Sequence, residues 1–177
     1  MNGKKLEADV AYTQIYGMAK KSIAIIDDYV GVKTLDLLRG IAKGVSVTIY
    51  SDEQGFESLT DQIKNDFSAA RPDVKLFTDR TKNKFHDRYI FLDYGLKGEK
   101  LFHCGASSKD AGNKITTIMQ IENTEIYHIL MDKLKREHYP LIKTNGLPIS
   151  FMRLRFSAVP LLFSSQIIRA WSQSFAI

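Results

Sequence analysis

The sequence has a single cysteine, Cys104, which lies in the apolar run LFHCG. One cysteine cannot form a disulfide framework or a cysteine metal cluster, so both are excluded, and we expect a small core residue in a reducing compartment. The opening residues, MNGKKLEADV, have no apolar stretch behind their lysines. We therefore expect no secretory signal and a cytoplasmic location.

Acidic residues are lacking after Glu137, and this uneven distribution accounts for most of the net charge of +5. The residues beyond it carry four positive charges, and removing these from the 25 basic residues leaves 21 against 20 acidic ones, or +1. The body of the chain is therefore nearly neutral. Any basic groove for nucleic acid must come from local clustering of lysine and arginine.

Long charge-free runs are also missing from the C-terminal part of the chain. The longest there, 156–168, has 13 residues and contains Pro160, so it is too short and broken to span a bilayer, and we expect no stable membrane insertion. We predict one domain over 1–137 and an extension over 138–177. The extension is an ordered segment packed on the domain or a partner, a loosely ordered or foreign C-terminus, or a membrane-surface helix.

Helical and strand patterns alternate along the first 137 residues. Apolar residues at helical spacing and turn residues predict helices over 8–21, 32–44, 56–70 and 124–137. Short apolar or β-branched runs predict strands over 22–27, 45–52, 74–77, 84–93, 100–105 and 114–121. This order predicts an α/β fold with a mixed β-sheet, parallel strands first, flanked by helices on both faces.

The predicted strand 84–93, KFHDRYIFLD, begins with a histidine and an arginine and ends with an aspartate, which an ordinary buried strand would not place there. In a strand His86 and Arg88 would share a face, because side chains alternate with a period of two. An imidazole can attack phosphorus or donate a proton at neutral pH, and a fixed cation neutralises phosphate oxygens. The pair therefore predicts a phosphate site, while a capping or edge histidine without chemistry is the alternative.

Polar residues that could complete such a site follow two other predicted strands. The turn from Gly105 to Asp110 offers backbone N–H groups and hydroxyls for phosphate oxygens. Asp27 and Asp28 end the first strand, where open α/β sheets bind ligands, although such residues also begin loops or cap helices. Lys84 directly precedes the motif and is a candidate for contact with a phosphate backbone.

The pattern H-x-R-x4-D, followed by G-A-S-S, resembles the H-x-K-x4-D and G-S-x-N signature of the phospholipase D superfamily. The resemblance covers about residues 5 to 137 and implies a PLD-like sandwich, with His86 as a nucleophile that forms a phosphohistidine. It also implies that Asp93 supports this histidine, and that Gly105 and Ser108 match the family's glycine and asparagine. Small members with one motif copy are typically dimeric, metal-independent nucleases or phosphodiesterases. Arg88 replaces the family lysine, and Ala106 replaces its serine.

We therefore expect a metal-independent phosphodiesterase of the nuclease type that acts on nucleic acid as a homodimer and needs no cofactor or metal. The alternatives are a catalytically silent PLD-like module that binds nucleic acid and, less favoured, a phospholipid hydrolase. The candidate residues fall into a catalytic group, His86, Arg88 and Asp93, and a phosphate- or substrate-binding group, Gly105, Ser107, Ser108, Lys84 and Lys109.

Overall fold

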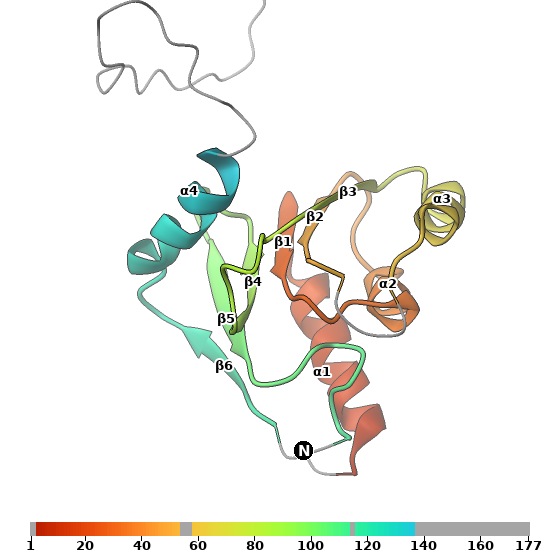
Figure 1. The fold of residues 1–177 in the computed structure, drawn as a ribbon, viewed down its shortest axis with the longest axis horizontal. Helices are drawn as coiled ribbons and strands as arrows, with labels where there is room; N and C mark the ends of the chain where they lie inside the picture. The colour runs from red at the N-terminus through yellow and green to blue at the C-terminus, as the bar shows by residue number, and fades with distance from the viewer. Residues whose placement is uncertain (1–2, 54–57, 114–115, 137–177) are drawn as a thin grey trace, which may run out of the picture. The chain divides into compact units, whose positions relative to one another are not determined.

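The computed structural model describes residues 3–53, 58–113 and 116–136, which form an α/β fold (Figure 1). The helices are α1 (Lys5–Gly17), α2 (Val32–Leu38), α3 (Asp61–Ala70) and α4 (His128–Arg136), the last preceded by a 3-10 turn, Glu125–Tyr127. The strands are β1 (Ser22–Ile26), β2 (Ser46–Tyr50), β3 (Lys75–Asp79), β4 (Arg88–Leu92), β5 (Lys100–Cys104) and β6 (Ile118–Ile121). None of the helices in the described ranges is long and apolar enough to cross a membrane.

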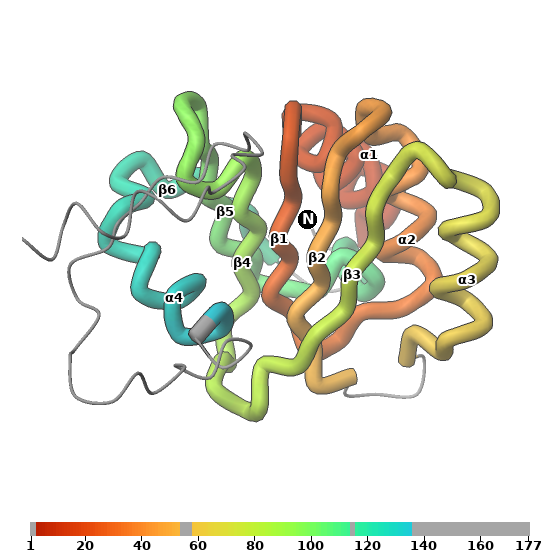
Figure 2. The backbone as a smooth tube through the Cα atoms, turned by 90° about the horizontal axis from the view of Figure 1, so that it is seen from above, coloured from red at the N-terminus to blue at the C-terminus, as the bar shows by residue number. Residues whose placement is uncertain are grey.

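The six strands form one mixed sheet in the order β3-β2-β1-β4-β5-β6 (Figure 2). Strands β1, β2 and β3 are parallel, and β4, β5 and β6 are added in antiparallel pairs. The predicted α/β class and mixed sheet with parallel strands first are confirmed. Because β4 is antiparallel to β1, its first residue, Arg88, lies at the edge of the sheet where the parallel strands end.

The central strand β1 is buried on both faces, which explains its continuous apolar run. Ile23 and Ile25 belong to a larger core cluster that also contains side chains of α1, α2 and α3, whereas Ala24 and Ile26 belong to a smaller cluster with side chains of α4. The alternation follows the period of two in a strand. Cys104 lies in the larger cluster, as expected for a core cysteine.

Several element boundaries differ from those predicted. The helix predicted over 56–70 begins at Asp61, because the Thr60 hydroxyl accepts a hydrogen bond from the Ile63 N–H and caps it. The helix predicted over 32–44 ends at Leu38. The predicted extension, 138–177, lies outside the described residues.

Candidate functional site

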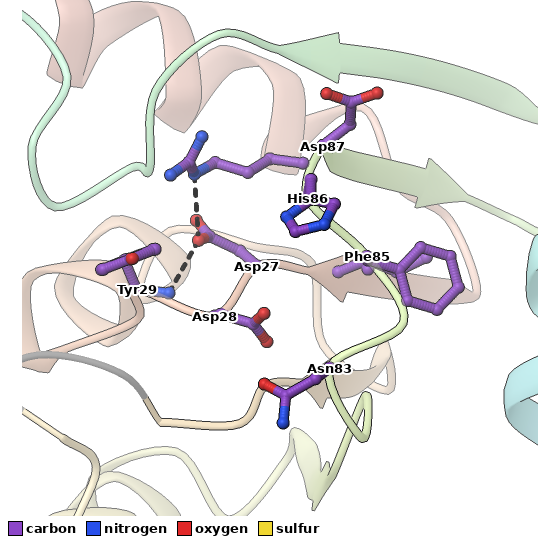
Figure 3. A pocket seen from close by; sticks show the side chains of 9 residues that line it. Asp27, Asp28, Tyr29, Asn83, Phe85, His86 and Asp87 are labelled. Carbon is purple, nitrogen blue, oxygen red and sulfur yellow. Dashed lines mark hydrogen bonds and ion pairs between the residues drawn. The ribbon is translucent and has the colours of Figure 1, made fainter.

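A pocket of about 230 Å³ lies at the carboxyl end of β1, beside the segment that enters β4. We call it the histidine pocket. Its walls come from the residues that follow β1 and from the residues before and at the start of β4 (Figure 3). The lining residues are Ile26, Asp27, Asp28, Tyr29, Asn83, Phe85, His86, Asp87 and Arg88.

Arg88 is held in this pocket by two contacts. Its Nε lies 3.3 Å from Oδ1 of Asp27, and its guanidinium carbon lies 5.3 Å from the ring centroid of Tyr29. The side chain keeps 26% of its surface exposed. The contact with Asp27 is at Nε, and a guanidinium carries four further N–H donors on its terminal nitrogens. The pocket therefore contains an oriented, solvent-accessible cation.

Asp27 is the buried group that orients this cation. Its side chain is only 5% exposed, and Oδ1 accepts a hydrogen bond of 2.9 Å from the Tyr29 N–H. Burial raises the pKa of Asp27, and this effect outweighs the hydrogen bonds from Tyr29 and Ser107 and the charge of Arg88, which act in the opposite direction. The sequence interpretation that Asp27 or Asp28 lines a ligand crevice agrees with this placement.

His86 lines the same pocket, but not as a strand residue. The predicted strand 84–93 begins only at Arg88, because β1 pairs with β4 up to Tyr89 and β5 pairs with it up to Arg88, so the preceding residues have no neighbouring strand. The expectation that His86 and Arg88 share one face of a strand is therefore wrong. The exposed His86 ring lies on the side of the backbone that faces Asp27 (Figure 3). No described residue makes a hydrogen bond or ion pair with its imidazole.

A polar network fixes the loop that leads to His86. Oδ1 of Asp28 accepts a hydrogen bond of 2.8 Å from the Asp52 N–H, and the Thr81 hydroxyl lies 2.6 Å from Oδ2 of Asp52. Asp52 also accepts the N–H groups of Lys82 and Asn83, which both have positive φ angles. Burial alone would raise the pKa of Asp52, but these hydrogen bonds outweigh it and lower the pKa. The ends of β1 and β2 thus position the loop.

The third predicted catalytic residue, Asp93, lies at the opposite end of β4. Its Oδ1 accepts the N–H groups of Lys20, Lys21 and Ser22 at 3.1, 2.7 and 3.0 Å. Burial would raise the pKa of Asp93, but these donors outweigh it and hold the pKa below its usual value. The structure therefore gives Asp93 a structural task, which is to anchor the connection from α1 to β1. It does not bring Asp93 to the histidine pocket.

The turn after β5 contacts residues that line the pocket, but none of its own residues lines it. Ser107 is buried and donates its hydroxyl to the Tyr29 carbonyl, and the buried Ser108 hydroxyl lies 2.9 Å from that of Thr34 in α2. The Gly105 N–H donates to the Thr117 carbonyl at 2.9 Å. Internal partners take these hydroxyls and this N–H, and none of the three residues lines the histidine pocket, so their phosphate contacts stay predictions.

The two predicted substrate-binding lysines have different positions. Lys84 is exposed and lines a second hollow beside His86, whereas Lys109 is absent from the lining of the histidine pocket. His103 packs against Tyr89 with ring centroids 5.4 Å apart and does not line the histidine pocket. No group of three or more histidine, cysteine or carboxylate side chains that could hold a metal ion occurs within the described ranges.

Sequence reasoning missed five residues that shape the site. Asn83, Phe85 and Asp87 line the pocket, and Asp52 and Thr81 hold its loop. Asp52 follows β2 directly, so the rule that polar residues at the carboxyl ends of parallel strands gather at one edge would have found it. Thr81 carried no recognisable pattern.

Comparisons with known proteins add little evidence on the function of this chain. No family model matches the chain, and no curated protein matches it. A solved structure described as TrmBL2, an archaeal chromatin protein with a novel mode of DNA binding, aligns with a TM-score of 0.41 at 13% sequence identity. The alignment covers 75% of this chain and 48% of that one, so the chain spans about half the length of that protein.

Proposed function

We propose that the protein is a phospholipase D-like phosphodiesterase that binds a phosphodiester of nucleic acid in the histidine pocket and cleaves it through His86 without a metal ion. The observation that carries the proposal is the meeting of His86 and Arg88 in one pocket at the end of β1. The finer fold assignment, a PLD-like sandwich with helices on both faces of the sheet, belongs to the same proposal.

The charges in the pocket favour a phosphodiester over a terminal phosphate. Asp28 and Asp87 line it together with the pair formed by Arg88 and Asp27, so carboxyl groups outnumber the fixed cation. A dianionic phosphomonoester meets more repulsion from these carboxylates than a phosphodiester with one negative charge. The terminal N–H groups of Arg88 supply charge-assisted hydrogen bonds to the non-bridging oxygens.

The proposed chemistry has two displacement steps. A ring nitrogen of His86 forms a bond to phosphorus while the bond from phosphorus to the leaving oxygen breaks, and that oxygen takes up a proton. Water then attacks phosphorus, the nitrogen–phosphorus bond breaks, and the water proton goes to a base. Two titratable groups must therefore flank the phosphorus. We propose that a second copy of the chain supplies the other His86 across a two-fold axis.

Binding and turnover of a short fluorescent oligonucleotide in the presence of a chelator test the proposal. Replacing Arg88 with glutamine removes the charge but keeps a donor for the buried Asp27, and we expect binding to weaken by roughly 1.5 to 3 kcal/mol. Arg88→Lys should retain most of the affinity. Arg39→Gln is the matched control, because Arg39 lies at the end of α2 with a 69% exposed side chain. Equal affinities for Arg88→Gln and Arg39→Gln would refute the proposal.

A catalytically silent nucleic-acid-binding module is the second candidate. It is favoured by the placement of Asp93, since the pocket unites only two of the three predicted catalytic residues. Oligonucleotide binding that depends on Arg88, with no cleavage by wild type, would identify this function. Phospholipid hydrolysis is the least favoured, and cosedimentation with liposomes tests it.

A further inference from the structure

A second hollow, which we call the aromatic groove, lies beside the histidine pocket. It has a volume of about 620 Å³ and runs between the segment that enters β4 and helix α4. Phe85, Tyr89 and Leu130 form its apolar wall. His86 and Asp87 line both hollows, as does Phe85, so the two hollows adjoin along this segment.

The aromatic rings of the groove are held in place by packing. Tyr89 lies against His103 and Tyr127, with ring centroids 5.4 and 5.7 Å away. Phe85 is half-buried and packs against the smaller core cluster. Both rings keep exposed surface. Their packing already fixes their orientation, so a bound ligand would not have to order them. Fixed aromatic faces are the feature that base stacking uses.

Two exposed lysines add positive charge to this apolar wall. Lys84 comes from the loop before β4, and Lys133 comes from α4 on the other side. The lining also contains one carboxylate, Asp87, so the two lysines leave the groove with an excess of one positive charge. The combination of aromatic and basic side chains fits a charged polymer with flat apolar groups.

We propose that the aromatic groove binds an unpaired base of a single-stranded nucleic acid whose phosphodiester lies in the histidine pocket. This inference rests on the proposed function and defines its substrate class. The rings of Phe85 and His86 point to opposite sides of the same backbone segment (Figure 3). A nucleotide likewise presents its base and its phosphate on opposite sides of the sugar. Bases in a duplex are stacked and paired, so only an unpaired strand can place a base on Phe85.

Fluorescence anisotropy with an oligothymidine strand and with a duplex hairpin tests this inference. The chosen variant is Phe85→Leu, which removes the aromatic face but keeps an apolar side chain for the smaller core cluster. The matched control is Phe77→Leu, because Phe77 is 53% exposed on β3 and lines neither hollow. We expect wild type to prefer the single strand, and Phe85→Leu to lose about tenfold or more of that affinity. Thermal unfolding of both variants checks that they remain folded.

Equal single-strand affinities for Phe85→Leu and Phe77→Leu, or a wild type that binds the duplex as tightly as the single strand, would overturn the inference. Cleavage of bis(4-nitrophenyl) phosphate, which needs no base stacking on a nucleotide, separates the two proposals. Retained cleavage with no effect of Phe85→Leu on oligonucleotide affinity refutes the groove alone. Single-strand binding that depends on Phe85 but not on Arg88 supports the groove and refutes the phosphodiester pocket.

Discussion

Replacing Asp93 with asparagine separates a structural role from a catalytic one. Asp93 is 6% exposed, and three backbone N–H groups converge on its Oδ1. Its φ of 54° lies in the left-handed region, which asparagine also tolerates. Asp93→Asn therefore removes the charge without adding backbone strain. It also places an amide N–H₂ where Oδ2 accepts the Lys20 N–H at 3.1 Å.

The expected loss of stability follows from the change in hydrogen-bond type. A hydrogen bond to a charged group contributes roughly 1.5–3 kcal/mol and a neutral one about 0.5–1.5 kcal/mol, so each weakened bond costs about 1–1.5 kcal/mol and three imply a loss of about 3–4.5 kcal/mol. The folded-state pKa of Asp93 is lowered, so its contribution is present above the unfolded pKa and is lost as pH falls through the folded value. The difference between wild type and Asp93→Asn should therefore shrink as the pH falls below about 4, the usual pKa of an aspartate.

Urea unfolding followed by circular dichroism, at neutral and at acidic pH, measures this difference. The same samples are then tested for cleavage of bis(4-nitrophenyl) phosphate while they are fully folded. We expect reduced stability at neutral pH with turnover retained. Unchanged stability together with lost turnover would refute the structural assignment and return Asp93 to the catalytic site.

Three further predictions concern the fold and the assembly. Gly112→Ala should destabilise the protein by at least about 1–3 kcal/mol, because the new Cβ would lie 2.7 Å from the Lys4 carbonyl oxygen at a φ of +85°. Gly95→Ala is the control, since Gly95 has a φ of +74° but open space around it. It should cost only about 1–2 kcal/mol, and thermal unfolding of both variants measures the difference. Cys104 is 3% exposed and burial raises its pKa to about 12, so a thiol reagent should react with it only in urea, and rapid labelling of the native protein would contradict its burial. The proposed dimer should sediment near twice 20.1 kDa, and mixing in His86→Ala chains should lower activity per wild-type chain; activity proportional to wild-type chains would contradict a shared site.

The sheet could be predicted from the sequence because its central strands have strong local patterns. The run in β1 is apolar at every position after Ser22, which a strand buried on both faces requires. The start of β4 could not be predicted in this way. The predicted strand includes residues 84–87, but the observed strand begins at Arg88, where β1 and β5 provide partners. This start depends on tertiary pairing, which the local sequence does not determine.

The candidate site was predictable in part for a similar reason. Asp27 could be predicted because it follows the carboxyl end of a strand, where open α/β sheets bind ligands. His86 and Arg88 could be predicted as a pair from their motif, although they do not share a strand face. The sequence of the turn does not predict the roles of Ser107 and Ser108, because a serine hydroxyl can either bind a ligand or support a loop. Their burial against Tyr29 and Thr34 distinguishes the two.

A covalent intermediate on His86 is the decisive evidence for the proposed phosphodiesterase chemistry. Wild type is mixed with a phosphodiester substrate in chelator, quenched at alkaline pH where phosphohistidine survives, digested and analysed by mass spectrometry, with His86→Ala as the control. We expect an adduct on the peptide that contains His86, made of phosphorus with the ester group that the first step does not displace. The His86→Ala variant should show neither the adduct nor turnover. Turnover that proceeds without an adduct on His86, or that requires a divalent metal ion, would contradict the proposed chemistry.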